Sequence, residues 1–110
     1  MDRTFTTYDA FWEQYLREHA DGRSRALHYI GTAVAIVLFV RFLANGSLWS
    51  LLLAVASGYI FASAGHFLIE KNRPAVFERP LWTLYSDFRM FGLFLSGRLP
   101  DHLRKAGVEP

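Results

Sequence analysis

The sequence contains no cysteine in 110 residues, and this absence removes several classes of protein at once. Without cysteine there is no disulfide framework, no zinc ribbon, no thiol nucleophile and no cysteine-ligated iron–sulfur cluster. Three other motifs are also missing: a Gly-x-Ser-x-Gly nucleophile elbow, a phosphate-binding loop and a His-Glu-x-x-His zinc motif. Any chemistry must therefore use other arrangements of side chains.

Charge is nearly absent from the middle of the chain. Arg41 is the one charged side chain in residues 30–69, although the whole chain has 12 basic and 10 acidic residues. A stretch this apolar excludes disorder and argues against a water-soluble globule. The net charge is only +2, and no run of five or six like charges occurs. We therefore expect a membrane, and no nucleic acid, as a partner of this chain.

A turn signal, Asn45-Gly46, divides the apolar stretch into two segments. Residues 48–69 carry no charge, and this length suffices for a hydrocarbon core that takes about 20 residues to cross. Residues 30–44 are fewer, but Arg41 lies near their end and can reach the membrane interface. The sequence thus predicts an all-α fold with a central transmembrane hairpin, formed by helices at about 23–44 and 48–70.

Amphipathic or spanning helices are expected on both sides of the hairpin. Apolar residues at helical spacing predict one at 8–19, and a proline suited to a first turn predicts another at about 80–95. Asp87 and Arg89 lie in the middle of the latter, which is either a third span with an interior polar pair or an interfacial helix. A short helix at about 101–106 completes a single helical membrane domain, residues 1–110.

Lysine and arginine residues gather on the open side of the hairpin, away from its turn. By the positive-inside tendency, the N-terminus and the loop after residue 70 face the cytoplasm. We therefore expect an integral membrane protein, of the inner membrane if its source is bacterial. The residues that give this orientation are Arg17, Arg23, Arg25, Lys71, Arg73 and Arg79.

Three of the four histidines are placed to meet at one level of the membrane. His28 lies about 17 residues before the turn and His66 about 20 after it, a depth difference of only about 5 Å at 1.5 Å per residue. His19 precedes His28 by nine residues, and the intervening Asp21-Gly22 turn lets the first helix fold back. His102 lies in a polar tail, where a solvated side chain is expected.

Convergent histidines suggest a metal, because imidazole suits iron, zinc, copper and nickel. Glu70 follows His66 by four residues and would share its helix face. Histidines with one carboxylate suit non-haem iron(II), with positions left open for oxygen and substrate. Arg73 could bind a substrate carboxylate bidentately, or it could contact lipid phosphate in a positively charged loop.

These residues lie in three blocks that resemble a known family of small membrane proteins. The family is typified by the fungal endoplasmic-reticulum 2-hydroxy fatty acid dioxygenase and has many short bacterial relatives. The matching blocks are Tyr15-Leu16-Arg17-Glu18-His19 leading to Leu27-His28-Tyr29-Ile30-Gly31-Thr32, then Gly65-His66-Phe67 leading to Glu70-Lys71-Asn72-Arg73-Pro74-Ala75, then Pro80-Leu81-Trp82 with Asp87-Phe88-Arg89-Met90.

The resemblance implies an Fe2+-dependent dioxygenase that uses molecular oxygen to shorten 2-hydroxy fatty acids, or a related lipid, by one carbon. It implies that His19, His28 and His66 are the metal ligands. Glu70 and Arg73 would then act in catalysis, while Asn72 and Arg73 would bind substrate. Two alternatives stay open: a non-catalytic scaffold or lipid-binding protein, and a protein that binds haem between its helices. No oligomeric state follows from the sequence.

Overall fold

The computed structural model describes residues 7–74, 76 and 78–110, so Ala75 of the second block lies outside the described residues. The described chain is helical and contains no strand, which confirms the predicted all-α class. Its elements are α1 (Tyr8–Arg17), α2 (Gly22–Asn45), α3 (Leu48–Ala64), the π-helix η1 (Gly65–Glu70), α4 (Pro80–Leu95) and α5 (Leu99–Lys105).

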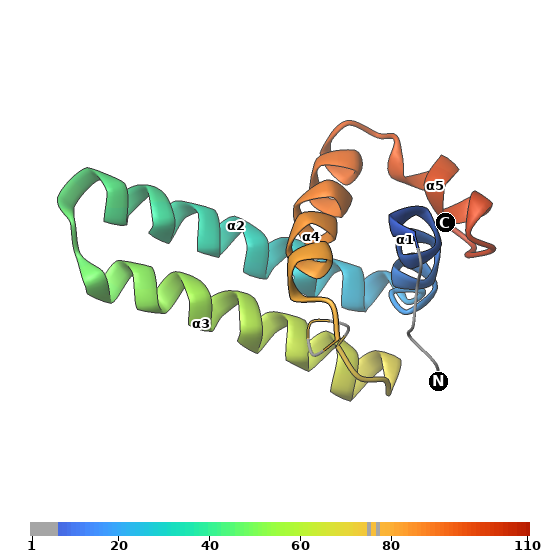
Figure 1. Ribbon diagram of the computed structural model, residues 1–110, viewed down its shortest axis with the longest axis horizontal. Helices are drawn as coiled ribbons and strands as arrows, with labels where there is room; N and C mark the ends of the chain where they lie inside the picture. The colour runs from blue at the N-terminus through green and yellow to red at the C-terminus, as the bar shows by residue number, and fades with distance from the viewer. Residues whose placement is uncertain (1–6, 75, 77) are drawn as a thin grey trace.

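Helices α2 and α3 form the predicted hairpin (Figure 1). Asp21 begins α2, because its side chain accepts a hydrogen bond from the backbone N–H of Arg23. This cap starts the helix at Gly22, slightly earlier than the sequence suggested. Gly46 ends α2 in the left-handed region with a φ of 69°, and Ser47 caps α3. The turn is therefore as short as the Asn45-Gly46 signal predicts.

The outer surface of the hairpin is apolar and exposed. Both Gly22–Asn45 and Leu48–Glu70 are long and apolar enough to cross a membrane, and only 11% and 17% of their most apolar windows are buried inside the molecule. Large side chains such as Val37, Leu43 and Ile60 are about two-thirds exposed. In a bilayer this surface would meet lipid. These features support association with a membrane.

Helix α4 crosses α2 and does not run alongside it (Figure 1). It packs against α1, α2 and α5, and at 16 residues it is shorter than the roughly 20 that a span requires. Its direction and its length favour the interfacial alternative for this helix. Helices α1 and α5 lie at the end of the molecule opposite the hairpin turn (Figure 1).

A compact aromatic core joins α1, α4 and α5. Tyr15, Leu16 and Met90 are 0–1% exposed within it. Arg89 lies over the ring of Trp12, with its guanidinium carbon 4.3 Å from the ring centroid. The remaining members of the cluster are Phe11, Leu99, Leu103, Ala106 and Val108. This core fixes α1 and α4 relative to each other at the open end of the hairpin.

The close approach of α2 and α3 depends on Gly31. A Cβ atom built at this position would lie 2.7 Å from Cβ of Phe61, closer than van der Waals contact allows. We expect Gly31→Ala to separate the helices and to lower the free energy of unfolding by about 1–3 kcal/mol. Thermal unfolding in detergent micelles measures this change. Gly58→Ala is the matched control, because nothing lies within 4 Å of a Cβ there. Equal melting temperatures for the two variants would contradict the prediction.

Candidate metal centre

His19, His28 and His66 come together at the open end of the hairpin. His28 lies on α2 and His66 lies in η1, while His19 follows α1, which ends at Arg17 and not at the predicted residue 19. The three side chains are 1%, 5% and 3% exposed. One ring nitrogen from each lies within 4.8 Å of the other two, so the group could hold a metal ion. The convergence expected from helix rise and turn position is therefore present.

Each imidazole is oriented by a hydrogen bond at Nδ1. His19 Nδ1 lies 2.6 Å from the backbone oxygen of Tyr15, and His28 Nδ1 lies 2.8 Å from that of Ser24. His66 Nδ1 lies 2.6 Å from Oδ1 of Asn72. Since oxygen atoms of this kind only accept, all three Nδ1 atoms carry the proton. The three Nε2 atoms are then left with lone pairs.

These lone pairs face one another at short range. Nε2 of His19 and Nε2 of His28 are 3.1 Å apart. Two neutral imidazoles with both Nδ1 atoms protonated repel at this distance unless a cation lies between them. Burial lowers the pKa of His19, and the neighbouring His28 lowers it further. Two nitrogens bound to one ion at about 2.1 Å are separated by a similar distance, so the residues fit a metal.

A break in helix geometry places the third histidine, His66. The final residues of the long second span adopt a π-helix, a form often found at functional sites, where the sequence predicted regular helix. Lys71 then takes a left-handed conformation with a φ of 60°, which is uncommon for a residue other than glycine. This reversal returns Asn72 to His66. The amide of Asn72 also donates to the backbone oxygen of Glu18 at 3.0 Å, which fixes which amide atom faces the imidazole.

Glu70 links the α1–α2 turn to the end of η1. Its Oε2 accepts from the backbone N–H of Asp21 at 2.7 Å and from the hydroxyl of Ser24. Among the described residues, the group whose ligand atoms lie within 4.8 Å consists of the three histidines alone. Glu70 therefore lies beside the cluster and supports the segment that carries Ser24, whose backbone oxygen is the acceptor of His28.

Gly65 allows η1 to pack closely against His28. A Cβ atom at this position would lie 3.3 Å from His28 Cε1.

Arg73 and His102 are not members of the cluster. Arg73 is largely exposed and forms an ion pair with Glu78. His102 is not simply solvated as expected, because its Nδ1 accepts a hydrogen bond from the indole N–H of Trp12 at 3.2 Å. Asp87 and Arg89 also point to different partners: Asp87 accepts from Tyr15, whereas Arg89 lies over Trp12.

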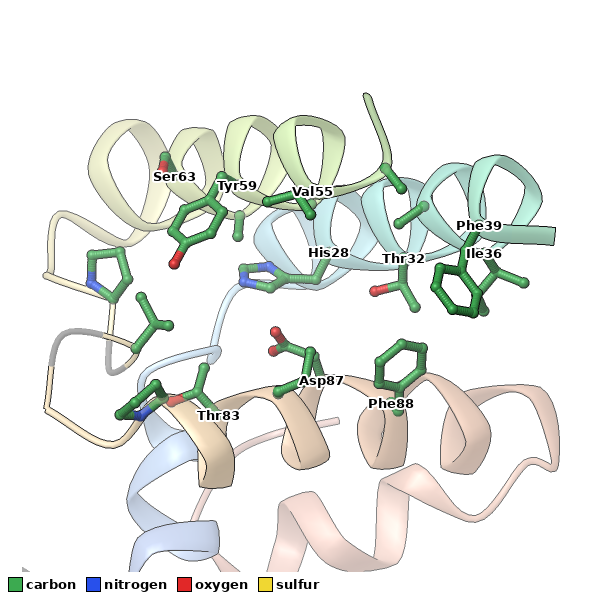
Figure 2. A pocket seen from close by; sticks show the side chains of 18 of the residues that line it. His28, Thr32, Ile36, Phe39, Val55, Tyr59, Ser63, Thr83, Asp87 and Phe88 are labelled. Carbon is green, nitrogen blue, oxygen red and sulfur yellow. The ribbon is translucent and has the colours of Figure 1, made fainter. Parts of the chain in front are cut away.

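A cavity of about 720 Å³ extends from His28 and His66 along the hairpin. Figure 2 shows its labelled lining: His28, Thr32, Ile36 and Phe39 of α2 on one side, Val55, Tyr59 and Ser63 of α3 on another, and Thr83, Asp87 and Phe88 of α4 opposite. From His28 to Val40 the lining covers about 18 Å of α2 at 1.5 Å per residue. The cavity is mostly apolar, and its ionisable groups lie near the histidines.

Two residues next to the cluster, Tyr15 and Asp87, were given no functional role from the sequence. Tyr15 provides the carbonyl that binds His19, and its hydroxyl donates to Asp87 Oδ1 at 2.5 Å. A tyrosine four residues before a histidine was the available signal, since such residues share a helix face. Asp87 was noted as a carboxylate within an apolar helix, but only the crossing of α4 over α2 shows that it lines the cavity.

The fold and the site define a helical protein with two potential membrane spans, a buried three-histidine cluster and an apolar cavity. Residues 5–99 match the family described as 2-hydroxy-palmitic acid dioxygenase Mpo1-like, and the chain belongs to this family. The resemblance inferred from the three blocks is thereby confirmed. Neither the curated proteins nor the solved structures contain a significant match to the chain.

We expect the purified protein to bind a single divalent metal ion per chain, and His66→Ala to abolish binding. The physical reason is that, among the described residues, only this cluster brings three ligand atoms within 4.8 Å of one another. His102→Ala is the matched control, since this fourth histidine bonds Trp12 outside the cluster. Metal content by elemental analysis and affinity by titration are the measurements. Equal metal content in the two variants would contradict the assignment.

We also expect Asn72→Ala to weaken metal affinity about 10–100-fold, the usual cost of losing a group that orients a ligand. The variant removes the acceptor for His66 Nδ1, so the imidazole loses both its orientation and its fixed tautomer. Arg73→Ala, one residue further along, should bind metal as the wild type does because its partner is Glu78. Unchanged affinity in Asn72→Ala would exclude this orienting role.

Proposed function

We propose that this chain is an Fe2+-dependent dioxygenase that shortens 2-hydroxy fatty acids by one carbon. The observation that carries the proposal is the buried convergence of three Nε2 lone pairs at the head of a long apolar cavity. The family to which the chain belongs is named for a dioxygenase of 2-hydroxy-palmitic acid, which agrees with this chemistry. Imidazole is a suitable ligand for iron(II).

The reaction balances without a further reductant. One 2-hydroxy acid and one O2 give the acid one carbon shorter, one CO2 and one water. Iron(II) held by His19, His28 and His66 would supply a centre that binds and activates oxygen. The three imidazoles that would hold the ion are neutral and would not offset its double positive charge, so the ion would attract an anionic head group. A 2-hydroxy carboxylate has this charge.

The cavity would receive the acyl chain. Its walls are formed by α2, α3 and α4, and several of the lining side chains are also exposed on the apolar surface, including Val55, Tyr59, Leu84 and Phe88. A lipid could therefore enter sideways from the bilayer while its head group stays near the histidines. This arrangement needs the hairpin in the membrane. By the positive-inside tendency, the histidine end would face the cytoplasm.

The remaining residues would have supporting roles. Glu70 holds the α1–α2 turn through Asp21 and Ser24, and Asn72 orients His66. Arg73 would exchange its partner Glu78 for the substrate carboxylate at the mouth of the site. A single small ion agrees better than haem with the 3.1 Å separation of His19 Nε2 and His28 Nε2, because a macrocycle would not fit between them.

The decisive experiment is oxygen consumption by the iron-loaded protein with 2-hydroxyhexadecanoic acid. We expect one O2 consumed for each pentadecanoic acid formed, measured with an oxygen electrode and by mass spectrometry. His66→Ala should abolish the reaction, whereas His102→Ala should retain it. Arg73→Ala should raise KM roughly 10-fold with little change in kcat, because a charge-assisted hydrogen bond to the carboxylate is lost.

Iron-loaded protein that consumes no oxygen with this substrate would refute the dioxygenase and favour a lipid-binding or scaffold protein. A Soret band in the purified protein would indicate haem instead. An unchanged KM in Arg73→Ala would remove only the role of that residue.

A further inference from the structure

A polar pair on α4 faces the histidine cluster across the cavity. Asp87 lies opposite His28 in Figure 2, and Thr83 lies one helical turn before it. Residues four apart share a helix face, so both side chains line the same part of the wall. Most of the neighbouring lining residues on α4, among them Leu84 and Phe88, are apolar.

Both members of the pair have unused hydrogen-bonding capacity. The Thr83 hydroxyl is buried with no hydrogen-bond partner among the described residues, and the residue is only 8% exposed. A carboxylate can accept about four hydrogen bonds, and at Asp87 the Tyr15 hydroxyl provides one, to Oδ1. An unpaired buried hydroxyl costs about 1–3 kcal/mol, so a group in the cavity that accepted its hydrogen bond would be stabilised.

The chemistry of the pair selects one part of the substrate. A carboxylate in a buried wall repels a second carboxylate but accepts a hydrogen bond from an alcohol. On a 2-hydroxy acid the only alcohol is the hydroxyl at carbon 2. The acid group would then turn toward the three histidines, away from α4.

We propose that Asp87 and Thr83 recognise the 2-hydroxyl group of the lipid: Asp87 accepts its hydrogen bond, and Thr83 donates one to the oxygen of the same hydroxyl. This inference rests on the proposed function and deepens it, since it names the residues that separate hydroxylated from ordinary fatty acids. Tyr15 is a positioning residue, because its hydroxyl holds the carboxylate of Asp87 in place.

Binding without turnover tests the proposal. The zinc-loaded protein in detergent is titrated with 2-hydroxyhexadecanoic acid and with hexadecanoic acid, each displacing a fluorescent fatty acid. The wild type should bind the hydroxy acid at least about 10-fold more tightly, the value of a hydrogen bond to a charged group. In Asp87→Leu this ratio should fall to about one, while hexadecanoic acid binds as well as before or better. Thr83→Val should lower the ratio by a smaller factor.

Control variants separate recognition from folding. Asp87→Leu leaves the Tyr15 hydroxyl without its partner, so the double variant Tyr15→Phe/Asp87→Leu removes both groups and should fold normally with the same lost discrimination. Tyr15→Phe alone keeps the carboxylate and the backbone oxygen that binds His19, and it should lower the ratio only partly. Ser86→Ala should keep the full ratio, because Ser86 bonds Tyr8 and does not line the cavity.

The outcomes are distinguishable. If Asp87→Leu and the double variant both keep the wild-type preference for the hydroxy acid, the proposal is overturned but the dioxygenase is not. The same holds if these variants lose affinity equally for the two acids. If the wild type binds neither acid, the proposed function fails first.

Discussion

The three hydrogen bonds at Nδ1 of His19, His28 and His66 are the constraint on which the rest of the structure depends. Each fixes a tautomer, and in this arrangement one ring nitrogen of each histidine lies within 4.8 Å of the other two. Two of the acceptors are backbone oxygens one helical turn before the histidine, so regular helix and its extension orient those rings locally. The third acceptor is the Asn72 side chain, which requires η1 and the left-handed Lys71 to reverse the chain. Helix geometry therefore orients His19 and His28, whereas the orientation of His66 requires local backbone strain at Lys71.

Such a cluster would be costly if it formed without a cation. Neutral imidazole nitrogens 3.1 Å apart, with their protons turned outward, repel each other in a region that excludes water. The surrounding contacts hold them there: Glu70 binds the α1–α2 turn, and Gly65 lets η1 lie against His28. The aromatic core of α1, α4 and α5 fixes the helix that leads to His19. A site that is held in a repulsive arrangement by its supports is organised for a ligand before the ligand arrives.

Features set by helix rise could be predicted from the sequence, and features set by irregular backbone or by helix crossing could not. The depths of His28 and His66 followed from counting residues to Asn45-Gly46, because two helices joined by a tight turn leave little freedom. The orienting role of Asn72 was missed, since neither the π-helix nor the reversal at Lys71 has a clear sequence signal. Glu70 was expected on the face of His66, but it is engaged by Asp21 and Ser24. Asp87 could be placed only once α4 was seen to cross α2.

The cavity of about 720 Å³ is not closed by protein alone, because several of its lining side chains are also exposed on the outer surface. Helices α2 and α3 of the hairpin form two walls of the cavity, and α4, which packs against α2, forms the third. The walls do not meet on every side, so apolar side chains such as Val55 and Phe88 both line the cavity and are exposed. In water this opening would be an unfavourable apolar patch. In a bilayer the opening would face lipid instead of water, and for the lipid substrate proposed above it would serve as an entrance. Under the proposed function, the membrane would be a structural part of the site as well as its surroundings, because lipid would complete the wall that the three helices leave open.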